Sequence, residues 1–83
     1  SVTEELLAQI ELYPNPASQL QHLISPVPIE SIKIIDISGK EAMQLTPNST
    51  VVDLDITSLA SGTYFIQLQI QGQYAYLKSI IQR

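Results

Sequence analysis

The chain has 83 residues, of which 45% are hydrophobic and 14% charged, with a net charge of −4. This length suits one domain, and the composition is too apolar for a disordered segment. Cysteine is absent, which excludes disulfides, thiolate metal sites and cysteine nucleophiles. The four basic residues are scattered, so the chain lacks the clustered charge that nucleic-acid binding needs (Lys33, Lys40, Lys78 and Arg83).

Residues 1–9 are predicted to form a linker or N-terminal extension that frays or makes one helical turn, since so short a helix is marginal alone. In the remaining chain, short apolar segments alternate with turn signals, a pattern typical of an all-β sandwich or barrel of antiparallel strands. Seven short strands are predicted, over residues 10–13, 20–24, 31–37, 41–45, 51–56, 63–70 and 74–81.

Proline and glycine set the expected limits of these strands. Pro14 ends the first strand, and the second is predicted to stop before Pro26 and Pro28, because proline cannot donate to a ladder. Gly39 supplies the positive φ of a tight hairpin after the third strand.

The last strands are separated by two further turns. Residues 57–60 are expected to form one helical turn, capped by Asp55 or Thr57 and ended by Gly62 in the left-handed region. Residues 63–70 show the clearest period of two, which puts Tyr64 on the buried face, and residues 71–73 form a hairpin turn.

Catalytic chemistry is not indicated. The single histidine, His22, is interpreted as an ordinary strand residue, and no serine lies in a nucleophile elbow. Asp53 and Asp55 share a strand face and would begin a calcium site, but Glu41, the next acid, is distant, so a solvated face is preferred. We therefore predict no enzyme activity, cofactor, metal site or small-molecule substrate.

Tyr74 and Tyr76 share one face of the last predicted strand with Lys78. Cross-strand packing is the simpler interpretation of these aromatic side chains. The alternative is an exposed patch that binds carbohydrate or protein.

Four short motifs follow one another in a fixed order. In this order they resemble the type A C-terminal sorting domain of the type IX (Por) secretion system of Bacteroidota. The residues that carry the resemblance are Tyr13, Pro14, Asn15, Pro16 and Ala17; Asp36, Gly39 and Lys40; Asp55, Leu59, Gly62 and Tyr64; and Lys78, Ile80, Ile81 and Arg83.

The resemblance implies an immunoglobulin-like β-sandwich over residues 10–83 that acts as a secretion signal. Such a domain follows an N-terminally fused cargo, directs it from the periplasm through an outer-membrane translocon, and is then removed by a surface sortase. The cargo is anchored at the cell surface or released. The alternative function is an immunoglobulin-like carbohydrate- or protein-binding accessory module of a secreted enzyme or adhesin.

We expect the terminal strand to be the recognition element, because an exposed edge can add to a partner's sheet. Lys78 and Arg83 would orient it against an acidic surface, and Gly62 and Tyr64 would shape it. The alternative is that the charges of Lys78 and Arg83 simply protect the edge from unwanted pairing. Free edges also predict a possible dimer by edge pairing or strand swapping.

Overall fold

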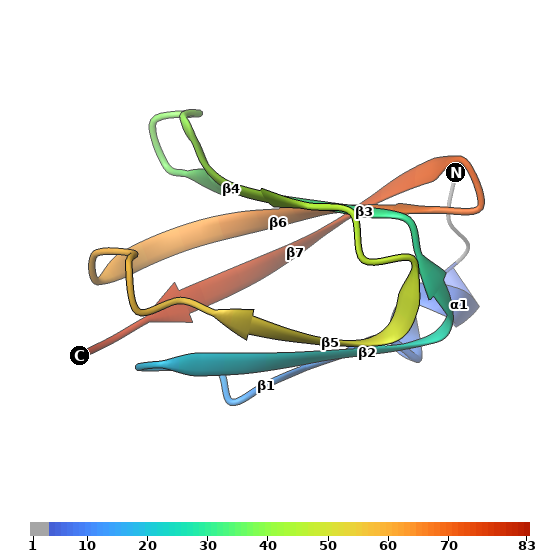
Figure 1. Cartoon of the computed structure of the whole chain (residues 1–83), viewed down its shortest axis with the longest axis horizontal. Coiled ribbons are helices and arrows are strands. Elements are labelled where there is room, and N and C mark those ends of the chain that lie inside the picture. Colours follow the sequence, from blue (N-terminus) through green and yellow to red (C-terminus); the bar gives the residue numbers. More distant parts are fainter. Residues whose placement is uncertain (1–3) are drawn as a thin grey trace.

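Two antiparallel sheets face each other in the computed structural model, which describes residues 4–83 (Figure 1). One sheet has the strand order β1-β2-β5, and the other has the order β4-β3-β6-β7. The elements are α1 Glu4–Ala8, β1 Glu11–Tyr13, β2 Leu20–Ile29, β3 Ser31–Asp36, β4 Glu41–Leu45, β5 Ser49–Asp55, β6 Gly62–Ile70 and β7 Gln73–Ile81. The prediction of an all-β, immunoglobulin-like sandwich with seven strands is confirmed.

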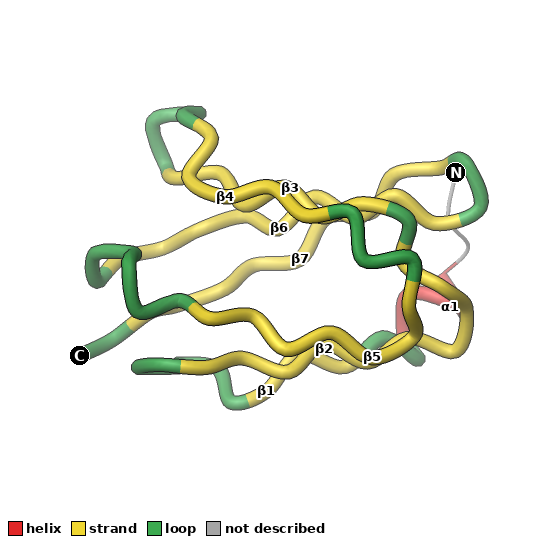
Figure 2. The backbone as a smooth tube through the Cα atoms, viewed as in Figure 1, coloured by secondary structure: helices red, strands yellow, loops and turns green. Residues whose placement is uncertain are grey.

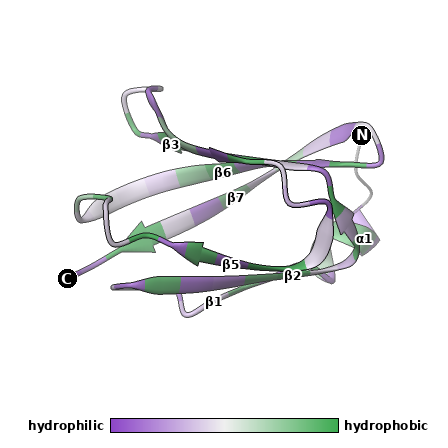
Figure 3. Ribbon diagram, viewed as in Figure 1, coloured by the Kyte–Doolittle hydropathy of each residue, from purple (hydrophilic) through white to green (hydrophobic). Residues whose placement is uncertain are grey.

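The core lies between the sheets and is built by alternation along each strand. In β6, Tyr64, Ile66, Leu68 and Ile70 are all buried, as the period of two predicts. Figure 3 shows apolar and polar residues alternating along the strands. Burying one such large side chain contributes roughly 1.5–3 kcal/mol, so these inward rows hold the sheets together.

Strand β2 is longer than predicted. It continues through Pro26 and Pro28 to Ile29, so the predicted end before Pro26 was wrong. Its pairing with β1 ends at Ile24, and its register with β5 shifts between Ile24 and Ile29. Pro26 and Pro28 therefore lie at positions of β2 that are not paired with a neighbouring strand, so their lack of an N–H group costs no ladder hydrogen bond.

The turns agree with the predictions in part. Gly39 has a φ of +88°, and Gln71 and Gly72 form a two-residue hairpin turn with φ values of +53° and +74°. Gly62 does not end a turn in the left-handed helical region. Its φ is +157°, a positive value that residues with a side chain rarely adopt, and it begins β6.

Residues 57–60 form a turn and not the expected helical turn. The Leu59 amide donates to the Ile56 carbonyl at 3.1 Å, which closes the turn. The Asp55 carboxylate accepts from the Thr57 amide at 3.0 Å, so the predicted capping role of Asp55 is present.

The N-terminal region forms the expected single helical turn at α1, whereas residues 1–3 of the predicted extension lie outside the described residues. Leu6 and Leu7 pack against the core. Helix α1 and the C-terminus lie at opposite ends of the molecule, whose longest dimension is 32 Å (Figure 1). Within residues 4–83, no helix is both long and apolar enough to cross a membrane.

Candidate recognition site

The motif segments meet at one end of the sandwich, here called the motif end. It consists of the β1–β2 loop, the β3–β4 turn, the β5–β6 loop and the end of β7 with Arg83 (left in Figure 1; loops in green in Figure 2). A hollow of about 200 Å³ lies between the β3–β4 turn and the start of β6. It is lined by Asp36, Ile37, Ser38, Ser61, Gly62, Thr63 and Tyr64.

Residues 15–17, which we call the strap, run along the outer edge of β7. The Asn15 side chain donates to the Lys78 carbonyl at 3.0 Å and accepts from the Ile80 amide at 2.9 Å. The Ala17 amide donates to the Ile80 carbonyl at 2.9 Å, and the Ala17 carbonyl accepts from the Gln82 amide at 2.8 Å. Ala17 thereby makes a parallel bridge with Ile81.

The strap changes the expectation for the terminal strand. Its hydrogen bonds occupy the edge of β7 from Lys78 to Gln82, so a partner strand cannot add there while the strap is in place. The predicted open edge was wrong for this part of β7. The first motif explains the difference, because Asn15 supplies the hydrogen-bonding groups that a neighbouring strand would supply.

A buried polar pair supports the strap from inside. Gln21 is 0% exposed and Ser79 is 1% exposed. The Gln21 amide group donates to the Pro14 carbonyl at 3.0 Å, and its oxygen accepts from the Ser79 hydroxyl at 2.7 Å. Gln21 lies outside the motifs, and Ser79 lies within the terminal one but was not among the predicted site residues. Gln21 shares the inward face of β2 with Leu23, a sign that its side chain is buried.

The Arg83 side chain bonds to its own chain. Its guanidinium donates to the carbonyls of Leu59 and Ile56, and its amide donates to the Ser61 hydroxyl at 3.2 Å. The Tyr64 hydroxyl donates to the Ala60 carbonyl at 2.7 Å, which resembles the tyrosine corner of immunoglobulin-like folds. The terminal motif and the Gly-x-Tyr motif therefore fasten the same β5–β6 loop.

Asp36 organises the neighbouring β3–β4 turn. Its carboxylate accepts from the Ser38 hydroxyl at 2.6 Å, the Ser38 amide at 2.9 Å and the Lys40 amide at 3.0 Å. The Ser38 hydroxyl, followed by the Lys40 amide, holds the pKa of Asp36 below its ordinary value of 3.8. Thr57 lowers the pKa of Asp55 in the same way, first through its hydroxyl and then through its amide.

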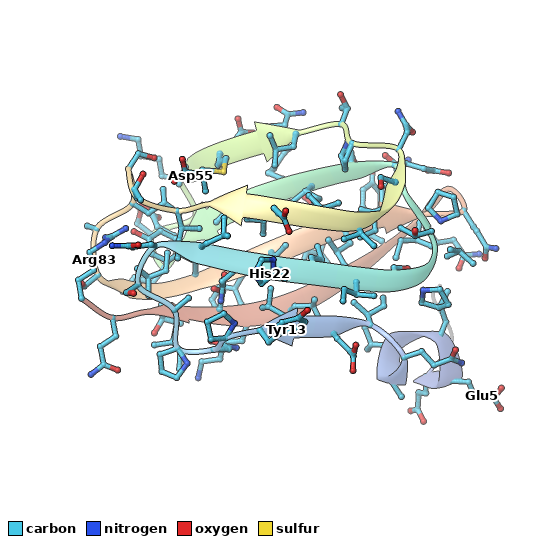
Figure 4. The ribbon with its side chains drawn as sticks, turned by 60° about the horizontal axis from the view of Figure 1, so that its bottom comes forward. Glu5, Tyr13, His22, Asp55 and Arg83 are labelled. Atoms are coloured by element: carbon cyan, nitrogen blue, oxygen red, sulfur yellow. The ribbon has the colours of Figure 1, made fainter. Side chains whose placement is uncertain are left out.

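The remaining candidates for chemistry lie on the outer face of the three-stranded sheet (Figure 4). His22 Nδ1 is 2.7 Å from Asp53 Oδ1, and the Tyr13 and His22 ring centroids are 5.2 Å apart. These residues occupy one cross-strand row over β1, β2 and β5. Over residues 4–83, no cluster of three or more His, Cys, Asp or Glu side chains is placed to hold a metal.

The predicted tyrosine patch borders a polar hollow of about 310 Å³ on the four-stranded sheet. Tyr74 and Tyr76 are 54% and 59% exposed, and Tyr76 accepts a hydrogen bond from the Gln67 amide at 3.1 Å. The hollow is lined by Ser31, Ile32, Lys33, Gln44, Thr46, Gln67, Gln69 and Tyr74. Lys33 lies 3.6 Å from Glu41, so its charge is paired.

Comparison with known proteins assigns the chain to a family. A model described as the secretion system C-terminal sorting domain matches residues 11–82. The chain belongs to this family. The matched range contains every motif residue of this sorting domain except Arg83, which directly follows it.

Four chains of solved structures also match this sorting domain. One is described as PorZ, an essential bacterial surface component of the type-IX secretion system of Porphyromonas gingivalis. The two share 20% identity with a TM-score of 0.77, over 100% of this chain and 13% of PorZ, so the likeness concerns the fold. No curated protein matches the chain.

Proposed function

We propose that this domain directs a cargo protein, fused before it, through the type IX secretion system and across the outer membrane. The cargo passes through the periplasm and then reaches the cell surface or the medium. The family match over residues 11–82 is the observation that carries this proposal. The fold adds that four motif segments, dispersed in sequence, lie together at the motif end.

The arrangement suits a signal that must serve unrelated cargoes. Helix α1, the first described element, lies at the end opposite Arg83 (Figure 4, where Glu5 marks α1). A cargo joined through residues 1–9 would therefore leave the motif end accessible to the translocon. Lys78 is exposed there, and neither ion pair among the described residues includes it.

Removal of the domain by a surface sortase, with anchoring of the cargo, is the second part of the proposal. The cut would fall within residues 1–9 or before them, ahead of the sandwich that starts at β1. The partners are then the translocon, the sortase and the fused cargo, and the domain acts by being recognised.

Export of a fluorescent reporter tests the secretion function. The reporter would carry residues 1–83, or the same chain without residues 78–83, in a host with type IX machinery. We expect surface fluorescence only with the complete domain. Because residues 78–83 also stabilise the fold, a Lys78→Ala variant distinguishes recognition from folding, since the exposed Lys78 side chain makes no hydrogen bond or ion pair with the described residues. Equal periplasmic retention of the complete and truncated reporters would contradict the proposal.

A binding module is the second candidate, favoured by the hollow beside Tyr74. The glutamine, serine and threonine side chains that line this hollow can both donate and accept hydrogen bonds, as binding to sugar hydroxyls requires. The tyrosine rings offer apolar faces beside them. Glycan-array binding that is lost in Tyr74→Ala and Tyr76→Ala, without loss of export, would establish it. No binding to any arrayed glycan would exclude this class for the arrayed sugars.

Self-association is the last proposed interaction. β7 is an edge strand, and the strap contacts it only from Lys78 onward, so pairing between two copies would use its first half. Sedimentation velocity over a concentration series should show a dimer that Tyr76→Pro abolishes, because proline removes an amide donor from that edge. A monomer at every concentration would contradict this proposal.

A further inference from the structure

Gln21 joins two halves of the sorting motif that are far apart in the sequence. Its side chain reaches the Pro14 carbonyl, 7 positions away, and the Ser79 hydroxyl, 58 positions away. Pro14 belongs to the first motif, and Ser79 lies in the terminal one. Among the described residues, no other side chain hydrogen-bonds to both of these motifs; the Asn15 side chain, itself in the first motif, bonds only to the terminal one.

The chemistry of the site requires an amide. At one end the side chain must donate to a carbonyl, and at the other it must accept from a hydroxyl. Glutamine does both, whereas a hydrocarbon does neither and an ionised carboxylate only accepts. No buried side-chain nitrogen or oxygen among the described residues lacks a partner, so each polar atom of this pair has at least one hydrogen bond.

Burial makes this contact the anchor of the strap. The Asn15 bonds to β7 are exposed, where water competes for the same groups. The Gln21–Ser79 bond is buried. A buried polar group that loses its hydrogen-bond partner cannot bond to water instead, so the free-energy cost is larger. Loss of the Gln21 amide should therefore loosen the strap more than loss of one exposed bond.

We propose that Gln21 is a positioning residue for sorting, which holds the strap on β7 so that the export machinery meets both motifs as one surface. This inference rests on the proposed secretion function. In this proposal the sorting signal is a folded surface formed by the first and the terminal motifs together. Gln21, which holds them together, belongs to neither motif.

Amide hydrogen exchange on the 83-residue chain tests the positioning step without any export assay. The amides to follow are those of Ile80 and Gln82, which donate to the strap at Asn15 and Ala17. In Gln21→Met we expect their protection factors to fall about tenfold further than those of β6 amides, because the hydrogen bonds of the strap go to β7 and Gln82. Ile34→Val, a core change away from the strap, is the control and should lower protection without this difference.

Gln21→Glu adds a pH-dependent readout of the strap that a general loss of stability would not produce. Protonated glutamic acid again offers one donor and one acceptor, whereas its ionised form cannot donate to Pro14. Burial favours the neutral form, so protection of Ile80 and Gln82 relative to β6 should rise as the pH falls from 7 to 4.5. The wild-type chain should show no such change.

Export of the fused reporter then tests the consequence. We expect Gln21→Met to reduce surface fluorescence several-fold, and Ile34→Val, matched in thermal midpoint, to export as wild type does. Unchanged strap protection in Gln21→Met would overturn the positioning role, and normal export despite lost protection would overturn its link to sorting. If the wild-type reporter is not exported, the secretion function itself fails, while the exchange result still decides whether Gln21 holds the strap.

Discussion

At the residue scale, Arg83 shows that a motif residue can serve the fold directly. Its guanidinium satisfies two loop carbonyls, of Leu59 and Ile56, while Tyr64 satisfies a third at Ala60. Carbonyls in a turn need partners just as those in a strand do. Arg83 thus fastens the β5–β6 loop.

Replacing Arg83 tests this structural role. Arg83→Ala removes two charge-assisted hydrogen bonds from partly buried carbonyls and should lower the free energy of unfolding by about 1–2 kcal/mol. Arg83→Lys should recover only part of the loss, because a single ammonium lacks the planar fork. Urea denaturation followed by circular dichroism measures both variants. Stability equal to wild type in Arg83→Ala would show that the contacts contribute nothing.

Acid sensitivity should arise from Asp36 and Asp55. Each pKa is lowered in the folded state, so each carboxylate stabilises the fold above its ordinary value of 3.8. That contribution is lost as the pH falls below 3.8 and through the folded-state pKa. The thermal midpoint of unfolding should therefore fall as the pH drops through this range. It should fall less steeply in the double variant that carries Asp36→Asn and Asp55→Asn. Parallel curves for the double variant and wild type, from pH 5 to pH 2, would argue against this origin.

At the element scale, β7 acts as an edge strand with a covered end. The strap takes the position of a neighbouring strand beside residues 78–82, and the Asn15 side chain makes two of its hydrogen bonds to β7. Covering an edge is a common means of preventing unwanted strand pairing. The first and last motifs of this chain are consequently parts of one structural unit.

Substitution of Asn15 separates its two contacts. Asn15→Ala loses both and should cost about 1 kcal/mol or less, because the bonds are exposed. Asn15→Asp keeps the acceptor for the Ile80 amide but loses the donor to the Lys78 carbonyl. We expect exchange of the Ile80 amide to be faster in Asn15→Ala than in Asn15→Asp. The reverse order, measured by nuclear magnetic resonance, would contradict the assigned geometry.

At the scale of the whole molecule, stability depends on a thin core between two sheets. A domain of this size buries only about 60–65% of its extended surface, so each core residue matters. Leu68 is 0% exposed in the centre of β6. The same core positions the four segments of the motif end, since each is attached to strands that contribute to it.

Truncating the core should therefore affect the entire domain. Leu68→Ala should lower the free energy of unfolding by about 2–5 kcal/mol, much of the total expected for so small a domain. Val51→Ala, at a side chain that is 56% exposed, is the control and should change it by less than about 1 kcal/mol. Chemical denaturation and limited proteolysis measure the difference. Similar losses in both variants would contradict the assigned core.

Features that depend on neighbouring residues could be predicted from the amino-acid sequence. Alternation predicted the buried face of β6 at Tyr64 and Ile66, and Gly39 predicted a positive φ. The order of the motifs also indicated the family. These signals are local because side-chain direction in a strand repeats every two residues, and because glycine tolerates backbone angles that other residues avoid.

Contacts between residues that are distant in the sequence could not be predicted in this way, because they depend on the folded sandwich. β2 passes through Pro26 and Pro28 because its neighbours leave those positions unpaired, which depends on the register with β5. The Asn15, Gln21 and Arg83 side chains bond to groups 63, 58 and 27 positions away, respectively. No short-range pattern encodes such partners, because strand order and packing bring them together only when the whole sandwich has formed.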